Sequence, residues 1–144
     1  MLVGMLNYIC LNGQNLEQHR WKNRILIIQT PEESLPQYQE QLSEFENSDL
    51  DFKERKLILY EVIKDKYRLT DFQDMKTAKV WKLSNEGFRN DLDKKEAFRV
   101  VLIGLDGGIK LEKETVLKKV DLFGIIDSMP MRKAELRTKS NRGT

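Results

Sequence analysis

Apolar and polar residues follow the pattern of β-strands at four places in the chain. Residues 25–28 and 57–63 are largely aliphatic runs, typical of strands that are buried on both faces. Residues 99–105 and 109–113 flank Asp106-Gly107-Gly108. An Asp-Gly pair between two such runs predicts a hairpin, because glycine adopts the positive φ of a tight turn without steric cost.

Between the first two strands, apolar residues recur at helical spacing. The apolar stripe consists of Leu35, Tyr38, Leu42 and Phe45. This spacing predicts a helix with the stripe buried, capped by Ser34 with Gln37 as its capping-box partner. A helix between two strands predicts a right-handed crossover, so these strands are expected to be parallel.

The remaining segments before the hairpin are harder to interpret. In the charged connector at residues 49–56, which precedes the second strand, Leu50 and Phe52 are expected to enter the core. Residues 66–83 show no clean period, which fits either an insertion with its own small hairpin or a flap. Residues 84–92 are expected to form a short helix.

The C-terminal part predicts a helix that is broken at a proline. Its apolar face consists of Val120, Leu122, Phe123, Ile125 and Ile126. Asp121 is the expected cap of this helix. Pro130 is expected to break the helix, and residues 131–137 are expected to continue as a second helical piece.

The predicted order is β-α-β-α-β-β-α, which is the core order of thioredoxin-like folds. It predicts an α/β protein with a four-stranded mixed sheet covered by helices on both faces. A fragment of a flavodoxin-like fold is the alternative, but the hairpin counts against it. We expect a leader or extra strand at residues 1–15, one domain at 16–138 and a disordered basic tail at 139–144.

Composition excludes several classes of function. Residues are 40% apolar and 33% charged, typical of a soluble globular domain. The 25 basic residues nearly balance the 23 acidic ones, so the net charge of +2 gives no general electrostatic reason to expect nucleic acid or a membrane surface as a partner. No apolar run reaches the ~20 residues that cross a bilayer. A protein partner remains the open possibility.

The first eleven residues are apolar and lack a basic start, so a strand or leader is favoured over a signal peptide. If the true start lies upstream, the protein is exported, for example to the periplasm; otherwise it is cytoplasmic. One cysteine, Cys10, and one histidine, His19, exclude an internal disulfide and make an ordinary zinc site implausible. No cofactor is expected.

Three stretches together resemble a known family. They are residues 20–24 before the first strand, the hairpin around Asp106-Gly107-Gly108, and the Met-Pro-Met-Arg box at residues 129–132. Over roughly residues 16–137 the chain is similar to the bacterial thioredoxin-like domain of unknown function, the prokaryotic relatives of the DUDES domain. The resemblance implies a thioredoxin-like fold distantly similar to peroxiredoxins, with no established activity.

Candidate site residues follow from where such folds carry their chemistry. A reactive cysteine after the first strand would gain thiolate character from the helix N-terminus, but Thr30 to Ser34 contain none. Thr30 and Glu33 in that loop and Trp81 in residues 66–83 are therefore candidate binding residues. Arg132 is a fourth, although Arg24 and Arg132 are more simply explained as ion-pair partners of Asp127 or Asp106.

These observations favour a non-enzymatic thioredoxin-like domain, a binding or structural module of unknown partner. The alternative is a one-cysteine peroxidase or thiol-disulfide oxidoreductase that uses Cys10, the weak catalytic candidate.

Overall fold

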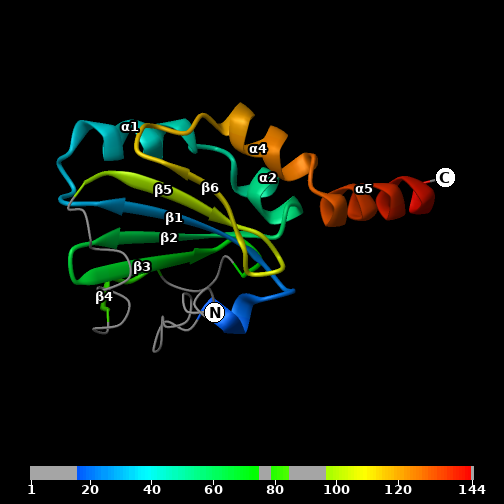
Figure 1. Ribbon diagram of the computed structural model, residues 1–144, viewed down its shortest axis with the longest axis horizontal. Helices are drawn as coiled ribbons and strands as arrows, with labels where there is room; N and C mark the ends of the chain where they lie inside the picture. The colour runs from blue at the N-terminus through cyan, green and yellow to red at the C-terminus, as the bar shows by residue number, and fades with distance from the viewer. Residues whose placement is uncertain (1–15, 75–78, 85–96, 144) are drawn as a thin grey trace, which may run out of the picture.

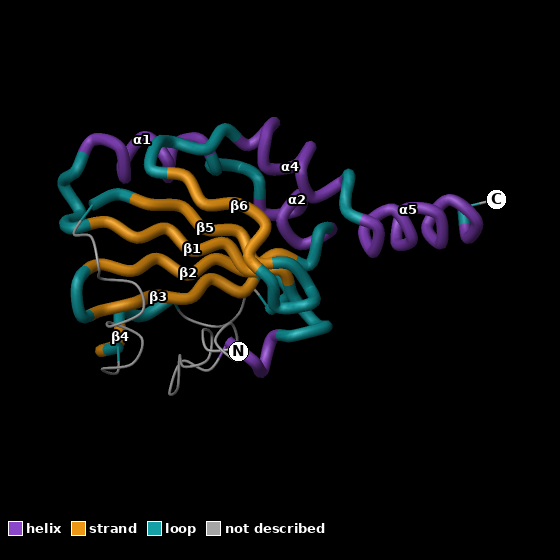
Figure 2. Tube along the Cα trace, in the orientation of Figure 1, coloured by secondary structure: helices purple, strands orange, loops and turns teal. Residues whose placement is uncertain are grey.

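The computed structural model describes residues 16–74, 79–84 and 97–143 of the 144-residue chain. It is an α/β protein in which a mixed six-stranded sheet carries helices (Figures 1 and 2). The strands are β1 (Arg24–Thr30), β2 (Leu57–Ile63), β3 (Lys66–Asp71), β4 (Lys82–Leu83), β5 (Arg99–Ile103) and β6 (Ile109–Lys113). The helices are α1 (Pro36–Glu44), α2 (Asp49–Glu54), α4 (Lys119–Asp127) and α5 (Pro130–Arg142), after a short 3-10 helix at Leu16–His19.

The strand order is β4-β3-β2-β1-β5-β6. The predicted parallel pairing of β1 with β2 is confirmed, and so is the antiparallel hairpin of β5 and β6. The predicted count of four strands is wrong, because residues 66–71 add β3 beside β2 and residues 82–83 add β4 beside β3. Residues 66–83 therefore contain the small hairpin that was one of the two expectations.

The strand β3 was hard to predict because it is short and only partly buried, and its neighbour β4 has only two residues. Tyr67 and Leu69 pack against the core on one face of the sheet. Arg68 points to the other face and pairs with Glu61, its direct neighbour on β2. Residues 66–70 therefore alternate polar and apolar side chains as a strand with one apolar face does, but the pattern covers only five residues.

The central strands are apolar on both faces because each face of the sheet packs into its own cluster of buried side chains. Leu26 and Ile28 of β1 face the helices, where they meet Tyr38 of α1, Phe52 of α2 and Leu122 of α4. Figure 1 shows these three helices along the same side of the sheet. The other face holds Ile25, Ile27, Ile58, Tyr60, Val62 and Val101, with Leu16 packed against them. The helix expected at residues 84–92 lies outside the described residues apart from Ser84.

Several details of the helices differ from the expectations. Helix α1 starts at Pro36 behind Leu35, so Ser34 is not its cap. The connector at 49–56 contains α2, which buries Phe52 but leaves Leu50 80% exposed. Val120 on α4 was expected on the apolar face but is exposed. Asp121 is not the cap of α4: Lys118 occupies the N-cap position, and Asp121 lies in the first turn of the helix.

The predicted break at the proline is confirmed. Helix α4 ends at Asp127 and α5 begins at Pro130. Helix α5 continues to Arg142, so residues 139–142, where we expected a disordered tail, form its last turn. In Figure 1, α5 extends away from the sheet with the C-terminus at its far end. Within the described ranges, no helix has the length and apolar character needed to cross a membrane.

Candidate functional site

A buried carboxylate interrupts the apolar sequence of β2. Glu61 is only 3% exposed and lies on the face of the sheet that carries the helices. The Tyr38 hydroxyl donates a hydrogen bond to Glu61 Oε1. Arg68 donates two more, from Nε to Oε2 at 3.1 Å and from Nη2 to Oε1 at 2.9 Å. Two donors thus compensate the burial of this charge.

Tyr38 and Arg68 come from two different elements, helix α1 and strand β3. Arg68 lies opposite Glu61 in the antiparallel register of β2 and β3, and Tyr38 is a buried residue of α1. Burial, followed by the hydrogen bond to Glu61, raises the pKa of Tyr38. The same carboxylate raises the pKa of Arg68 through its hydrogen bonds. Tyr38 therefore keeps its proton, and Arg68 its charge, near neutral pH.

Trp81 covers the outer side of this ion pair. The guanidinium carbon of Arg68 lies 4.5 Å from the centre of the indole ring, and Lys66 Nζ lies 5.8 Å from it. Both distances are within the range of cation–π contacts. Trp81 is half-buried against the core, so part of its ring reaches the surface above Arg68.

The loop after β1 lies at the same end of the sheet. Thr30 pairs with Ile63, so β1 and β2 end together. Thr30 is buried and donates from Oγ1 to the Glu32 carbonyl at 2.9 Å. The Glu33 carbonyl accepts a hydrogen bond from Gln39 at 2.6 Å, and the charge of exposed Glu33 contributes to the raised pKa of Tyr38.

We call this end of the sheet the carboxyl-end rim. It consists of Thr30, Glu33, Tyr38, Glu61, Arg68 and Trp81. The structure thus puts three of the four predicted binding residues, Thr30, Glu33 and Trp81, at one end of the parallel strands. The three residues that complete the rim were not predicted. Glu61 carried the available signal, because a carboxylate inside an apolar strand requires a buried partner.

Arg132, the fourth predicted binding residue, is not part of the rim. It is buried beside the start of β1, where its Nε donates to Asp127 Oδ1 at 2.9 Å. Arg55 donates to the same carboxylate at 3.1 and 2.8 Å, and Arg24 pairs with Glu135 at 3.1 Å. These contacts tie the first turns of α5 to α4 and the sheet, as the ion-pair interpretation of Arg132 anticipated.

Replacing Asp127 with asparagine is expected to weaken this attachment and to reduce the acid sensitivity of folding. Burial alone would raise the pKa of Asp127, but hydrogen bonds from Arg55 and Arg132 hold the pKa below its usual 3.8. The contribution of Asp127 is therefore present above that pH and lost as the pH falls through the folded-state pKa. Because the carboxylate is partly exposed, we expect a loss of about 1 kcal/mol at neutral pH.

Urea unfolding of both proteins across the acid range measures this effect. The two stabilities should converge as the pH falls. A difference between them that does not change with pH would contradict this role of the Asp127 charge.

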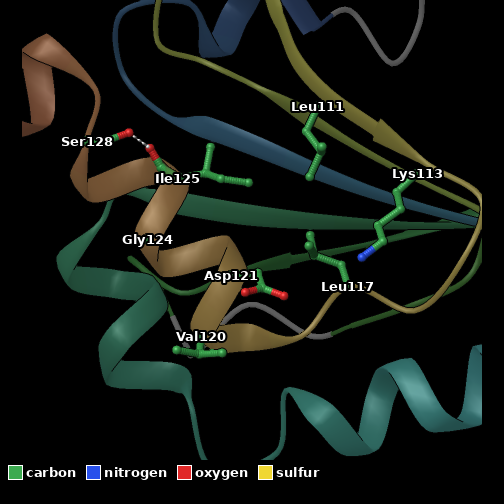
Figure 3. Close-up of a pocket in the computed structure, with 8 residues that line it drawn as sticks. All are labelled: Leu111, Lys113, Leu117, Val120, Asp121, Gly124, Ile125 and Ser128. Atoms are coloured by element: carbon green, nitrogen blue, oxygen red, sulfur yellow. Dashed lines mark hydrogen bonds between the residues drawn. The ribbon is translucent and has the colours of Figure 1, made fainter.

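A groove of about 690 Å³ lies between β6 and α4 (Figure 3). Its lining residues are Leu111, Lys113, Leu117, Val120, Asp121, Gly124, Ile125 and Ser128. Leu111, Leu117 and Ile125 point into it from three sides, and Ser128 turns its hydroxyl back to the Ile125 carbonyl at 2.7 Å. The groove has an apolar floor and one charge of each sign, which selects no particular ligand.

Cys10, the weak catalytic candidate, lies outside the described residues. Among the residues that the structure describes, no group of three or more histidine, cysteine, aspartate or glutamate side chains is arranged to hold a metal ion.

Residues 15–135 of the chain match a family model described as Domain of unknown function (DUF4174). The match includes the whole rim, helices α1, α2 and α4, and the start of α5. No curated protein matches the chain.

Proposed function

The chain belongs to the DUF4174 family, a domain of unknown function, and we propose that it is a protein-binding domain whose contact surface is the carboxyl-end rim. The single observation that carries the proposal is the arrangement of Trp81 over the Arg68–Glu61 pair. Tryptophan and arginine are the residue types that most often dominate the binding energy of protein interfaces. Here the Trp81 ring and the Arg68 guanidinium stack on each other at the protein surface.

The position of the rim supports the proposal. In open α/β sheets, ligands bind outside the carboxyl ends of the parallel strands, where neighbouring connections leave in different directions. The chain leaves β1 through the Thr30–Glu33 loop toward α1, whereas β2 continues directly into β3. The rim occupies this position.

We infer a binding role rather than a catalytic one from the pairing of the charges. Glu61 accepts hydrogen bonds from both Tyr38 and Arg68. A carboxylate engaged in this way is a poor general base, because its oxygens already hold donors. The cluster is better suited to orient Arg68 and Trp81 than to transfer a proton.

We further propose that the domain is thioredoxin-like. What supports this is the order of four neighbouring strands, β2-β1-β5-β6, with a parallel pair joined by α1 and followed by an antiparallel hairpin and α4. On this proposal the β3-β4 hairpin is an addition at the β2 edge, and the rim lies where the first helix of such a fold begins.

The proposal predicts that peptides bind in a manner that depends on Trp81. An array of extended peptides of varied composition is titrated against the wild-type chain, Trp81→Ala and the matched control Trp21→Ala. Trp21 is 57% exposed and lies before β1, at the opposite end of the strands. We expect Trp81→Ala to weaken binding about tenfold or more, and Trp21→Ala to leave it unchanged.

Thermal unfolding of each variant separates lost binding from lost structure. Trp81→Ala and a rim variant at an exposed position, Glu33→Ala, are both expected to unfold cooperatively. The proposal fails if no peptide binds, or if peptides bind equally well to the wild-type and Trp81→Ala chains.

A further inference from the structure

The surface next to Trp81 carries an unusual concentration of positive charge. Lys64, Lys66, Lys79 and Lys82 are all exposed. Lys64 lies in the turn between β2 and β3, Lys66 on β3, Lys79 on the segment that leads into β4, and Lys82 on β4 itself, opposite Tyr67. Residues 79–83 contain no acidic residue. We call these four lysines together with Trp81 the lysine patch.

On β2 and its turn to β3, the acidic residues that the structure describes are Glu61 and Asp65, and they offset the patch only in part. Glu61 is buried and is engaged by Arg68 and Tyr38. Asp65 is exposed and lies between Lys64 and Lys66 in the sequence, so it offsets at most one of the four lysine charges. The whole chain carries only +2, so this excess is a local feature rather than a consequence of the composition.

Two exposed apolar side chains lie next to lysines in the same segment. Val80 is 53% exposed and Leu83 is 73% exposed, on either side of Trp81 and Lys82. The patch therefore offers apolar contacts as well as positive charge along one short segment. Strand β4 is terminal in the sheet order, so that segment lies at an edge of the sheet.

We propose that the lysine patch binds an extended, acidic segment of a partner protein, in which acidic and aliphatic residues alternate. This inference rests on the proposed function and names the chemistry of its partner. Opposite charge attracts the segment, and aliphatic side chains cover Val80 and Leu83 beside the Trp81 ring. Lysines on an edge strand also protect against unwanted strand pairing, and this simpler role gives no affinity for acidic peptides.

The test compares two matched peptides of about ten residues, a length suited to lie along a strand edge. In one, glutamate alternates with valine, and in the other glutamine replaces glutamate. Binding is measured by fluorescence anisotropy at increasing salt. We expect the acidic peptide to bind about tenfold more tightly at low salt and to lose this advantage as salt screens the charges.

Charge-reversed variants locate the effect. Lys66→Glu combined with Lys82→Glu is expected to weaken binding of the acidic peptide about tenfold or more. The control Lys133→Glu combined with Arg137→Glu reverses two exposed charges on α5 and is expected to leave binding unchanged.

The outcomes separate this inference from the proposed function. If both peptides bind with equal affinity and Trp81→Ala weakens both, the acidic specificity is wrong and the binding rim stands. If neither peptide binds and the wider array also fails, both proposals are wrong. Tighter binding of a single-stranded oligonucleotide than of the acidic peptide would overturn the assignment of a protein partner.

Discussion

Replacing Phe52 with alanine is expected to lower the free energy of unfolding by about 3–5 kcal/mol. Phe52 is 1% exposed and is the centre of an aromatic cluster. Its ring makes edge-to-face contacts with Phe45 at 5.2 Å, Phe72 at 4.8 Å and Phe123 at 5.8 Å between ring centres. The alanine variant loses the buried area of the ring and leaves a cavity that three rigid neighbours cannot fill by small movements.

The matched control lies two residues away on the same helix. Leu50 of α2 is 80% exposed, so Leu50→Ala is expected to change stability by no more than about 0.5 kcal/mol. Urea unfolding monitored by circular dichroism measures both variants. A loss below about 1 kcal/mol for Phe52→Ala would contradict the central position of this ring.

Replacing Glu61 with alanine is expected to cost about 2–3 kcal/mol of stability. The substitution leaves the buried Tyr38 hydroxyl and the Arg68 guanidinium without the acceptor that they share. The cost stays below that of a fully buried ion pair because the Arg68 side chain is 26% exposed and partly hydrated. Arg68 is also expected to lose its fixed position under Trp81.

Two controls separate the burial of Glu61 from its charge. Glu61→Gln keeps the size of the side chain and one acceptor, so we expect a smaller loss than for alanine. Glu112→Ala removes an exposed carboxylate that pairs with Arg99 at 2.7 Å, and is expected to cost no more than about 1 kcal/mol. Equal losses for Glu61→Ala and Glu112→Ala would refute the structural importance of the buried pair.

The sequence predicts the centre of the sheet well because apolar burial determines it. Strands β1, β2 and β5 are buried over most of their length and are largely aliphatic in sequence. The β5-β6 turn is predictable because Gly107 adopts a φ of 84°, which glycine tolerates without strain. Neither inference required knowledge of distant contacts.

Polar pairing explains what the sequence did not predict. Arg68 of β3 is half-buried on the face of the sheet that carries the helices, where Glu61 lies opposite it and pairs with its charge. A second difference concerns apolar residues: Leu50 and Phe52 were both expected in the core, but the orientation of α2 buries only Phe52. The rim depends on such contacts between elements, so the sequence predicted Thr30, Glu33 and Trp81 from their local positions but not Tyr38, Glu61 and Arg68.

The most direct test of the binding rim is a backbone amide chemical-shift map of the wild-type chain titrated with the acidic peptide. The account predicts concentration-dependent shifts on β3, on β4 and at Trp81, with none on α5 or in the groove between β6 and α4. Shifts confined to that groove, or to α5, would place the binding surface elsewhere and contradict the assignment of the rim.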